Sequence, residues 1–173
     1  IWYPGDTLQA SIGQSDHLFT PIQLANYVAT LANGGTRYKL HIIKEVKSEA
    51  DSKTILKNEP EVVDKIEIND NNYKAIIDGM RAVSETGTAS NVFANYPIPV
   101  GGKTGTASVP VGTANALFVA VAPLDNPQIA IAIVVEHGGH GNYVAPIAKN
   151  IISYYMQLNT TPEKQVPQNT LIP

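Results

Sequence analysis

The hydrophobic residues of this chain first fall into segments with the spacing of helices. Thr20 can cap a helix, Pro21 suits its first position, and Gln23 can reach back to the cap as a capping-box partner. The apolar stripe that follows ends at Asn33 and the glycines after it, since glycine readily takes the left-handed conformation that closes a helix. Further helices are predicted over residues 70–84, 89–93 and 145–157.

Shorter apolar runs predict strands. A proline-containing turn, residues 123–127, separates two of these runs, and the pair therefore indicates an antiparallel hairpin. In its second strand Ala130 and Ala132 share one face, where their small side chains would let the last helix pack closely. A polar turn at residues 48–52 separates a weaker pair. The predicted strands are 38–46, 53–57, 100–108, 117–122 and 129–135.

The order of these elements predicts an α+β fold in which an antiparallel sheet is covered by helices. We expect residues 1–158 to form part of one domain and the polar, proline-punctuated residues 159–173 to form a flexible tail. The first residues lack an initiator methionine and the pattern of a signal peptide, so we expect the chain to begin within a larger protein. The longest apolar stretch, residues 114–135, is broken by prolines and polar residues and is not expected to cross a membrane as one helix.

Composition and charge narrow the range of partners. A chain of 173 residues with 43% hydrophobic and 16% charged residues can bury a core. Its net charge of -3, from 12 basic and 15 acidic residues without a basic cluster, argues against nucleic acid as a partner. The absence of cysteine from the sequence excludes disulfides and thiolate metal ligands within it.

The strand predicted over residues 100–108 begins with the sharpest local motif, Gly-Gly-Lys-Thr-Gly-Thr-Ala. Its Gly-Lys-Thr triplet invites a phosphate-loop interpretation, but that motif needs a glycine where Pro97 stands. The alternative is an edge strand whose glycines let a ligand approach the backbone. On such a strand Lys103 supplies positive charge, and Thr104 and Thr106 present hydroxyls on one side. This arrangement suits a carboxylate.

Three other groups of residues invite functional interpretations, and simpler ones are favoured. Residues 85–89 nearly copy the motif, but glutamate replaces its lysine, so they predict only a turn that ends a helix. Neutral imidazoles at His137 and His140 can bind zinc, but the chain offers no nearby third ligand beyond Glu136 or Asn142, so a polar turn is favoured and any further ligands would come from a preceding segment. Trp2 and Tyr3 are expected to anchor a loop rather than to face a substrate.

Several short motifs, taken in order, resemble the class B penicillin-binding proteins, and most closely their elongation- or sporulation-type members from low-GC Gram-positive bacteria. Each motif is weak alone, but their order and spacing together are specific and cover the chain to about residue 157. The resemblance implies the penicillin-binding and serine β-lactamase-like transpeptidase fold, of which this chain would be the C-terminal part. The matching segments are 5–7, 12–14, 20–25, 32–35, 103–107 and 136–139.

In this family a Lys-Thr-Gly strand lines the active-site cleft, and the resemblance gives that role to Lys103, Thr104 and Gly105. It implies that the backbone N–H of Thr106 donates to the oxyanion of the reaction. It also implies that the hydroxyls of Thr104 and Thr106, with the charge of Lys103, hold the carboxylate of a D-Ala-D-Ala peptide or a β-lactam. We therefore expect these four residues to form the catalytic and substrate-binding site on this chain.

The nucleophilic serine of the family has no counterpart in the sequence. None of its serines is followed by lysine at the third position, and none begins a Ser-x-Asn motif, so we expect both motifs on a preceding segment. The N-terminal half of the same domain would then be the first partner of this chain. Taken alone, the chain should form no acyl-enzyme.

The activity implied by the resemblance is that of a peptidoglycan D,D-transpeptidase, an enzyme that works by serine acyl transfer and requires no cofactor. A membrane anchor upstream, an extracytoplasmic location and partners in the machinery of cell-wall elongation or sporulation are implied as well. The alternative is a catalytically silent relative that senses β-lactams or wall peptides. The sequence of the complete gene would decide between the two functions.

Overall fold

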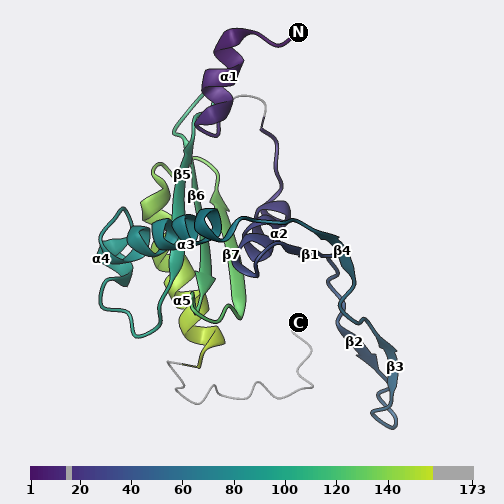
Figure 1. Ribbon diagram of the computed structural model, residues 1–173. Coiled ribbons are helices and arrows are strands. Elements are labelled where there is room, and N and C mark those ends of the chain that lie inside the picture. Colours follow the sequence, from purple (N-terminus) through teal and green to yellow (C-terminus); the bar gives the residue numbers. More distant parts are fainter. Residues whose placement is uncertain (15–16, 158–173) are drawn as a thin grey trace, which may run out of the picture.

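The computed structural model describes residues 1–14 and 17–157, and its centre is a three-stranded antiparallel sheet. The strands β5 (Gly101–Ala107), β6 (Asn115–Ala122) and β7 (Ile129–Val135) lie in the order β5-β6-β7 (Figure 1). The predicted hairpin, the strand before it and the α+β class are therefore confirmed. Because β6 is central, β5 has one edge without a strand partner in the described part of the chain.

Helices cover both faces of this sheet. The predicted capping box at residue 20 is present, since the backbone N–H of Gln23 donates to Thr20 Oγ1 at 3.4 Å and that of Thr20 donates to Gln23 Oε1 at 2.8 Å. The helix that follows and the other three predicted helices are confirmed with small shifts at their ends. The helices are α1 (Pro4–Ser11), α2 (Pro21–Ala32), α3 (Asp70–Glu85), α4 (Ser90–Phe93), the 3₁₀ helix η1 (Gly141–Val144) and α5 (Ala145–Tyr155).

The first helix, α1, was not predicted, and the expectation of a loop anchored by Trp2 and Tyr3 is wrong. Pro4 occupies the first helical turn, and the carboxylate of Asp6 accepts a hydrogen bond from the backbone N–H of Tyr3 at 2.8 Å. Both aromatic side chains are exposed, and the Trp2 indole N–H donates to Thr7 Oγ1 at 2.8 Å. Tyrosine is an unusual residue before a helix, which hid this start from the sequence pattern.

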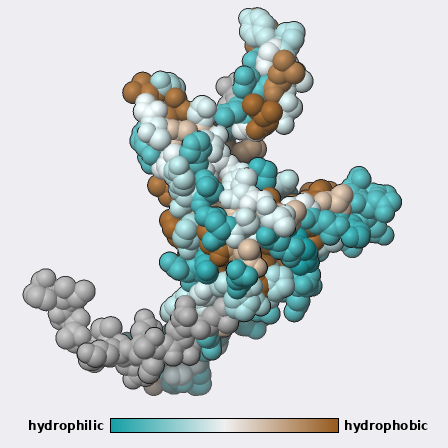
Figure 2. Space-filling view, turned by 90° about the vertical axis from the view of Figure 1, so that its left-hand side faces the viewer, coloured by the Kyte–Doolittle hydropathy of each residue, from teal (hydrophilic) through white to brown (hydrophobic). Residues whose placement is uncertain are grey.

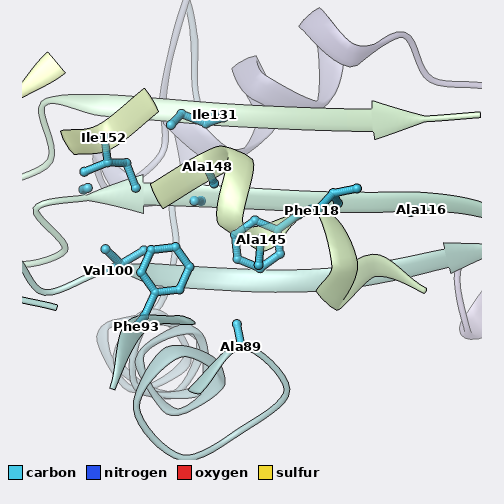
Figure 3. Close-up of a cluster of buried hydrophobic side chains, with 12 residues drawn as sticks. Ala89, Phe93, Val100, Ala116, Phe118, Ile131, Ala145, Ala148 and Ile152 are labelled. Carbon is cyan, nitrogen blue, oxygen red and sulfur yellow. The ribbon is translucent and has the colours of Figure 1, made fainter. Parts of the chain in front are cut away.

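One face of the sheet packs against α4, η1 and α5 (Figure 3). Phe118 of β6 and Ile131 of β7 lie on this face, in one buried cluster with Phe93 of α4 and Ile152 of α5. The rings of Phe93 and Phe118 stack with their centroids 6.1 Å apart. This cluster fixes α4 and α5 to the sheet, and with them the turns at either end of β5.

The alanine face of β7 is covered by α2, which corrects the expectation that the last helix would pack there. Ala130 lies against a second buried cluster, which contains Val28 of α2 and Val121 of β6. The last helix, α5, packs on the isoleucine face instead, because its own fully buried Ala145 and Ala148 allow the close approach. Small residues on either partner permit such contact, so the strand pattern alone could not assign the helix to a face.

A narrow ribbon projects from the body between α2 and α3 (Figure 1). In it β1 (Thr36–Tyr38) pairs with β4 (Val62–Lys65), and farther out β2 (Glu45–Lys47) pairs with β3 (Thr54–Lys57). The predicted strand 38–46 is therefore wrong over most of its length, and β4 was missed. Every residue of β2, β3 and β4 is exposed, so no buried face imposes an alternating pattern on these strands.

Apolar side chains also remain on the surface. Figure 2 shows brown patches at the top of the molecule, where α1 projects, and Leu8 and Ile12 are exposed there. Within residues 1–14 and 17–157, the helices are too short or too polar to cross a membrane. The predicted tail, residues 159–173, lies outside the described residues, and the domain boundary at residue 158 stays a prediction.

The buried hydroxyl of Ser84 in α3 is expected to lower the stability of the fold. Ser84 is 2% exposed, and its hydroxyl has no hydrogen-bond partner among the residues that the structure describes. Since a buried unpaired hydroxyl is unfavourable, Ser84→Ala is expected to raise the free energy of unfolding by about 1 kcal/mol in urea titrations. The buried Ser153 accepts or donates a 2.8 Å hydrogen bond with Tyr96, so Ser153→Ala should lower it by a similar amount. A loss of stability in both variants would contradict this account.

Candidate functional site

The motif predicted to bind a carboxylate lies on the edge strand β5, and packing requires its first two glycines. A Cβ on Gly101 would lie 2.5 Å from Cδ1 of Leu124, and one on Gly102 would lie 2.8 Å from Cζ of Phe118. Side chains at these positions would force the buried Leu124 and Phe118 side chains to move. Both glycines are buried, and Lys103 is the first residue of β5 whose side chain is exposed to solvent.

The ammonium group of Lys103 turns toward the free edge of β5. Its Nζ donates to the carbonyl oxygen of Thr104 at 2.7 Å. The Lys103 side chain leaves the sheet on the face opposite to the side chain of Thr104, as successive strand residues do. It forms no ion pair with any carboxylate of the described residues. The positive charge is therefore available to an anionic ligand.

Thr104 and Thr106 project from the other face of β5, as the strand alternation predicted. They line a polar pocket of about 400 Å³ together with Thr88, His140 and Tyr143. Hydroxyl groups from β5 and from the turn after α3 thus meet in one concave space, and Lys103 borders a neighbouring pocket with Thr88 and Thr104. A pocket of this kind offers several hydrogen-bond donors to a small polar group.

The open edge of β5 also offers a backbone donor. Gln14, which follows α1, donates from Nε2 to the carbonyl oxygen of Thr106 at 3.3 Å and lies 3.5 Å from Ser108 Oγ. The Thr106 carbonyl therefore faces away from β6. In an antiparallel ladder the N–H and C=O of one residue point to the same side, so the Thr106 N–H also lies at the open edge.

Two groups from outside β5 reach the hydroxyls of the motif. The Thr88 hydroxyl oxygen lies 3.1 Å from that of Thr104. The backbone N–H of Gly141, in η1, donates to Thr106 Oγ1 at 3.3 Å. A Cβ on Gly141 would lie only 2.3 Å from the carbonyl oxygen of Gly105, so glycine is required for η1 to lie this close to the strand.

Sequence reasoning missed Gln14, Thr88 and Gly141 as parts of this site. Residues 85–89 do end α3, which stops at Glu85, but the same turn also folds back onto β5. Its Thr-Gly-Thr-Ala sequence, shared with the motif, was the visible signal. Chain spacing alone does not show that two such segments face each other.

A salt bridge holds α3 across the sheet. Arg81 of α3 pairs with Asp125, which lies in the turn between β6 and β7. The hydrogen bond to Asp125 is the main reason why the pKa of Arg81 is raised above its ordinary value. The guanidinium therefore stays charged, and the pair helps to fix α3, whose following turn contains Thr88.

The two histidines considered as zinc ligands, His137 and His140, contact different residues. His137 Nδ1 lies 3.0 Å from the carbonyl oxygen of Thr113, and its backbone N–H donates to Asn115 Oδ1 at 2.9 Å. The ring of His140 instead meets that of Tyr143 edge-on, with centroids 5.5 Å apart. Among residues 1–14 and 17–157, no three His, Cys, Asp or Glu residues are placed to hold a metal ion. The zinc hypothesis thus gains no support, and His140 belongs to the polar pocket.

An apolar groove of about 450 Å³ borders Lys103 on the other face of the sheet. It lies between α2, α3 and the first two strands of the sheet, and both Tyr27 and Ile76 are exposed along it. Exposed apolar surface of this extent commonly marks a contact with another segment or protein. Its lining includes Leu24, Tyr27, Leu31, Ile76, Met80 and Val119.

Comparison with known proteins gives one consistent match. A family model described as "Penicillin binding protein transpeptidase domain" matches residues 1–153. Penicillin-binding protein 2A of Bacillus subtilis (strain 168) is 32% identical over 183 residues, which cover 95% of this chain and 25% of that protein. Peptidoglycan D,D-transpeptidase MrdA of Escherichia coli (strain K12) is 31% identical over 173 residues, which cover 90% of this chain and 27% of that protein.

The fold matches solved structures in the same way. Penicillin-binding protein 2B of Streptococcus pneumoniae (strain R6) superimposes with a TM-score of 0.77 and 32% sequence identity. The match covers 99% of this chain and 29% of that one. The chain thus spans about a quarter of the length of the curated relatives it matches.

Proposed function

Because the chain belongs to the penicillin-binding protein transpeptidase domain family, we propose that it forms one wall of the active site of a peptidoglycan D,D-transpeptidase. The reaction is acyl transfer through a serine, which cross-links the cell wall. One observation carries the proposal. The ammonium of Lys103 lies at the open edge of β5, and the hydroxyls of Thr104 and Thr106 line a polar pocket on the neighbouring face of the same strand.

The substrate group at this edge is the carboxylate of a D-Ala-D-Ala peptide end, or that of a β-lactam. Lys103 has no carboxylate partner in the described part of the chain, so a bound anion would meet an uncompensated positive charge. The hydroxyls of Thr104 and Thr106 add donors on the neighbouring face. Hydrogen bonds to an ionised group are roughly twice as strong as neutral ones, which favours a carboxylate over an uncharged group.

Thr106 contributes a second function through its backbone. Its N–H lies at the open edge of β5, as the contact between Gln14 and its carbonyl oxygen implies. There it serves as one of the donors to the oxyanion that forms when the substrate carbonyl is attacked. A fixed donor of this kind is worth about 3 kcal/mol of barrier, because the hydrogen bond strengthens as charge develops. An added Cβ on Gly105 would lie 3.1 Å from Cβ of Leu117, so glycine at this position lets β5 and β6 pair closely.

The nucleophilic serine and the middle motif come from the N-terminal half of the same domain. The apolar groove beside Lys103 supports this, since a segment packed there would lie next to the lysine. Tyr27 and Ile76, exposed in the chain, would then be buried in the complete domain. This assignment makes the other half of the domain the first partner of the chain.

The wider setting follows from the substrate. Peptidoglycan lies outside the cytoplasmic membrane, so the complete protein acts at the extracytoplasmic face and is held there by an anchor upstream of this chain. Its partners are the enzymes of cell-wall elongation or of sporulation. No cofactor takes part in the proposed acyl transfer, for which a serine, its base and the β5 donors are sufficient.

Fluorescent penicillin tests the proposal directly. The complete protein is expected to take up the label covalently, and an excess of unlabelled penicillin should prevent it. This chain alone should stay unlabelled, because it has no Ser-x-x-Lys motif. Label on the isolated chain would refute the assigned location of the nucleophile. A correctly folded complete protein that takes up no label would refute the transpeptidase assignment.

A further inference from the structure

The turn after α3 brings a third threonine to the motif strand. Gly87 lies tightly against α3, where an added Cβ would be 2.9 Å from the Cα of Val83. The next residue, Thr88, places its hydroxyl oxygen 3.1 Å from that of Thr104, which is within hydrogen-bond distance. Thr88 is exposed, so its side chain contributes little to the core. The contact of its hydroxyl with Thr104 therefore points to a role at the site rather than in packing.

We infer that Thr88 is a positioning residue for the substrate carboxylate: its hydroxyl donates to Thr104 and so directs the single Thr104 proton to the ligand. The inference rests on the proposed function. A hydroxyl carries one proton, which rotates freely, and can accept as well as donate. A carboxylate only accepts, so Thr104 must donate to it and is left with an acceptor site. Thr88 supplies the matching donor at 3.1 Å.

The hydroxyl of Thr106, like that of Thr104, has a neighbouring group that can donate a hydrogen bond to it. The Gly141 N–H can only donate, so Thr106 Oγ1 is the acceptor of their 3.3 Å hydrogen bond and its own proton stays free. Both hydroxyls of β5 can thus accept a hydrogen bond from another group that lines the pocket, which leaves their own protons for a ligand. A pair of donors held in this way suits an anion and opposes a group that itself needs to donate.

The same turn offers a matched control. Thr86 lies two residues before Thr88, is also exposed, and lines the same pocket beside Lys103 and Thr104. Its hydroxyl, however, donates to the carbonyl oxygen of Ala82 of α3 at 3.3 Å. Substituting valine for either threonine removes a hydroxyl and keeps the branched shape. The two substitutions differ in which hydrogen bond they remove.

The experiment measures acylation of the complete protein by a penicillin. Thr88→Val is expected to lower the second-order acylation rate constant about tenfold. This is the effect of losing one hydrogen bond in the series that runs from Thr88 through Thr104 to the charged carboxylate. Thr88→Ser, which keeps the hydroxyl, should stay within about threefold of wild type, and Thr86→Val within about twofold. In a Thr104→Val background, Thr88→Val should lower the acylation rate constant by less than about twofold, because the Thr104 hydroxyl that Thr88 orients is already absent.

Two results would overturn the inference. One is a Thr88→Val protein that reacts as fast as wild type. The other is a loss that is the same in the Thr104→Val background, since an independent effect would not act through Thr104. Should the wild-type complete protein take up no penicillin at all, the proposed function itself would fall. A reactive wild type beside an equally reactive Thr88→Val variant would remove this inference alone.

Discussion

Replacing Lys103 with alanine in the complete protein is expected to lower the second-order rate constant of acylation by a penicillin about 100-fold. The ammonium is exposed and forms no ion pair with a carboxylate of the described residues, so its charge is free to act on a bound anion. A hydrogen bond to a charged group contributes about 1.5–3 kcal/mol, and each 1.36 kcal/mol is tenfold in rate. Stopped-flow fluorescence with a reporter penicillin measures this constant.

Two variants control for charge and for fold. Lys103→Arg keeps the positive charge on a group of different shape and should retain more activity than the alanine variant. Lys74→Ala removes an exposed charge from α3, where Lys74 pairs with Asp78, and should leave the rate within about twofold of wild type. A Lys103→Ala protein that is acylated at the wild-type rate would show that this cation is not part of the anion site.

Placing a carboxylate in the apolar groove is expected to prevent assembly of the domain. Ile76 of α3 is 40% exposed in this chain and lines the groove beside Lys103. If a helix of the N-terminal half packs there, Ile76→Asp buries an unpaired charge, which costs about 3–5 kcal/mol. The complete variant should then lose most of its cooperative thermal transition and its penicillin labelling.

The chain offers a close control for this change. Ile151 of α5 is also 40% exposed, and its helix lies on the opposite face of the sheet. Ile151→Asp should shift the free energy of unfolding by no more than about 1 kcal/mol and leave labelling intact, since a partly exposed carboxylate stays hydrated. If Ile76→Asp behaved like Ile151→Asp, the groove would be open to solvent in the complete protein.

The elements that were predicted well are those with one buried face. The apolar stripe of α2 and the apolar runs of β6 and β7 were visible because burial imposes a period of 3.6 or 2 on the sequence. In the ribbon, β2, β3 and β4 have no such face: the prediction of β3 as residues 53–57 is confirmed, but the strand predicted over 38–46 was misplaced and β4 was missed. The choice of face for α5 was also wrong, because Ala130 on the strand and Ala148 on the helix each permit close packing.

The candidate site was predictable only along one strand. The motif placed Lys103, Thr104 and Thr106 correctly on an edge strand, with both hydroxyls on one face. The groups that approach from Thr88 and Gly141 depend on how α3 and η1 fold back, and local sequence does not encode that. For Gly141 a signal existed, since a glycine between polar residues often marks a close backbone approach.

The open edge of β5 exposes a row of backbone groups that a strand from another molecule can pair with, which is a common route to aggregation. Natural sheets often protect such edges with a lysine, because a strand that paired there would have to desolvate the lysine ammonium. Lys103 lies within β5 and is exposed there. Lys103 would thus both attract a small anion and hinder the pairing of β5 with another molecule. A mutation that removes its charge to weaken anion binding would therefore also make the protein more prone to aggregate.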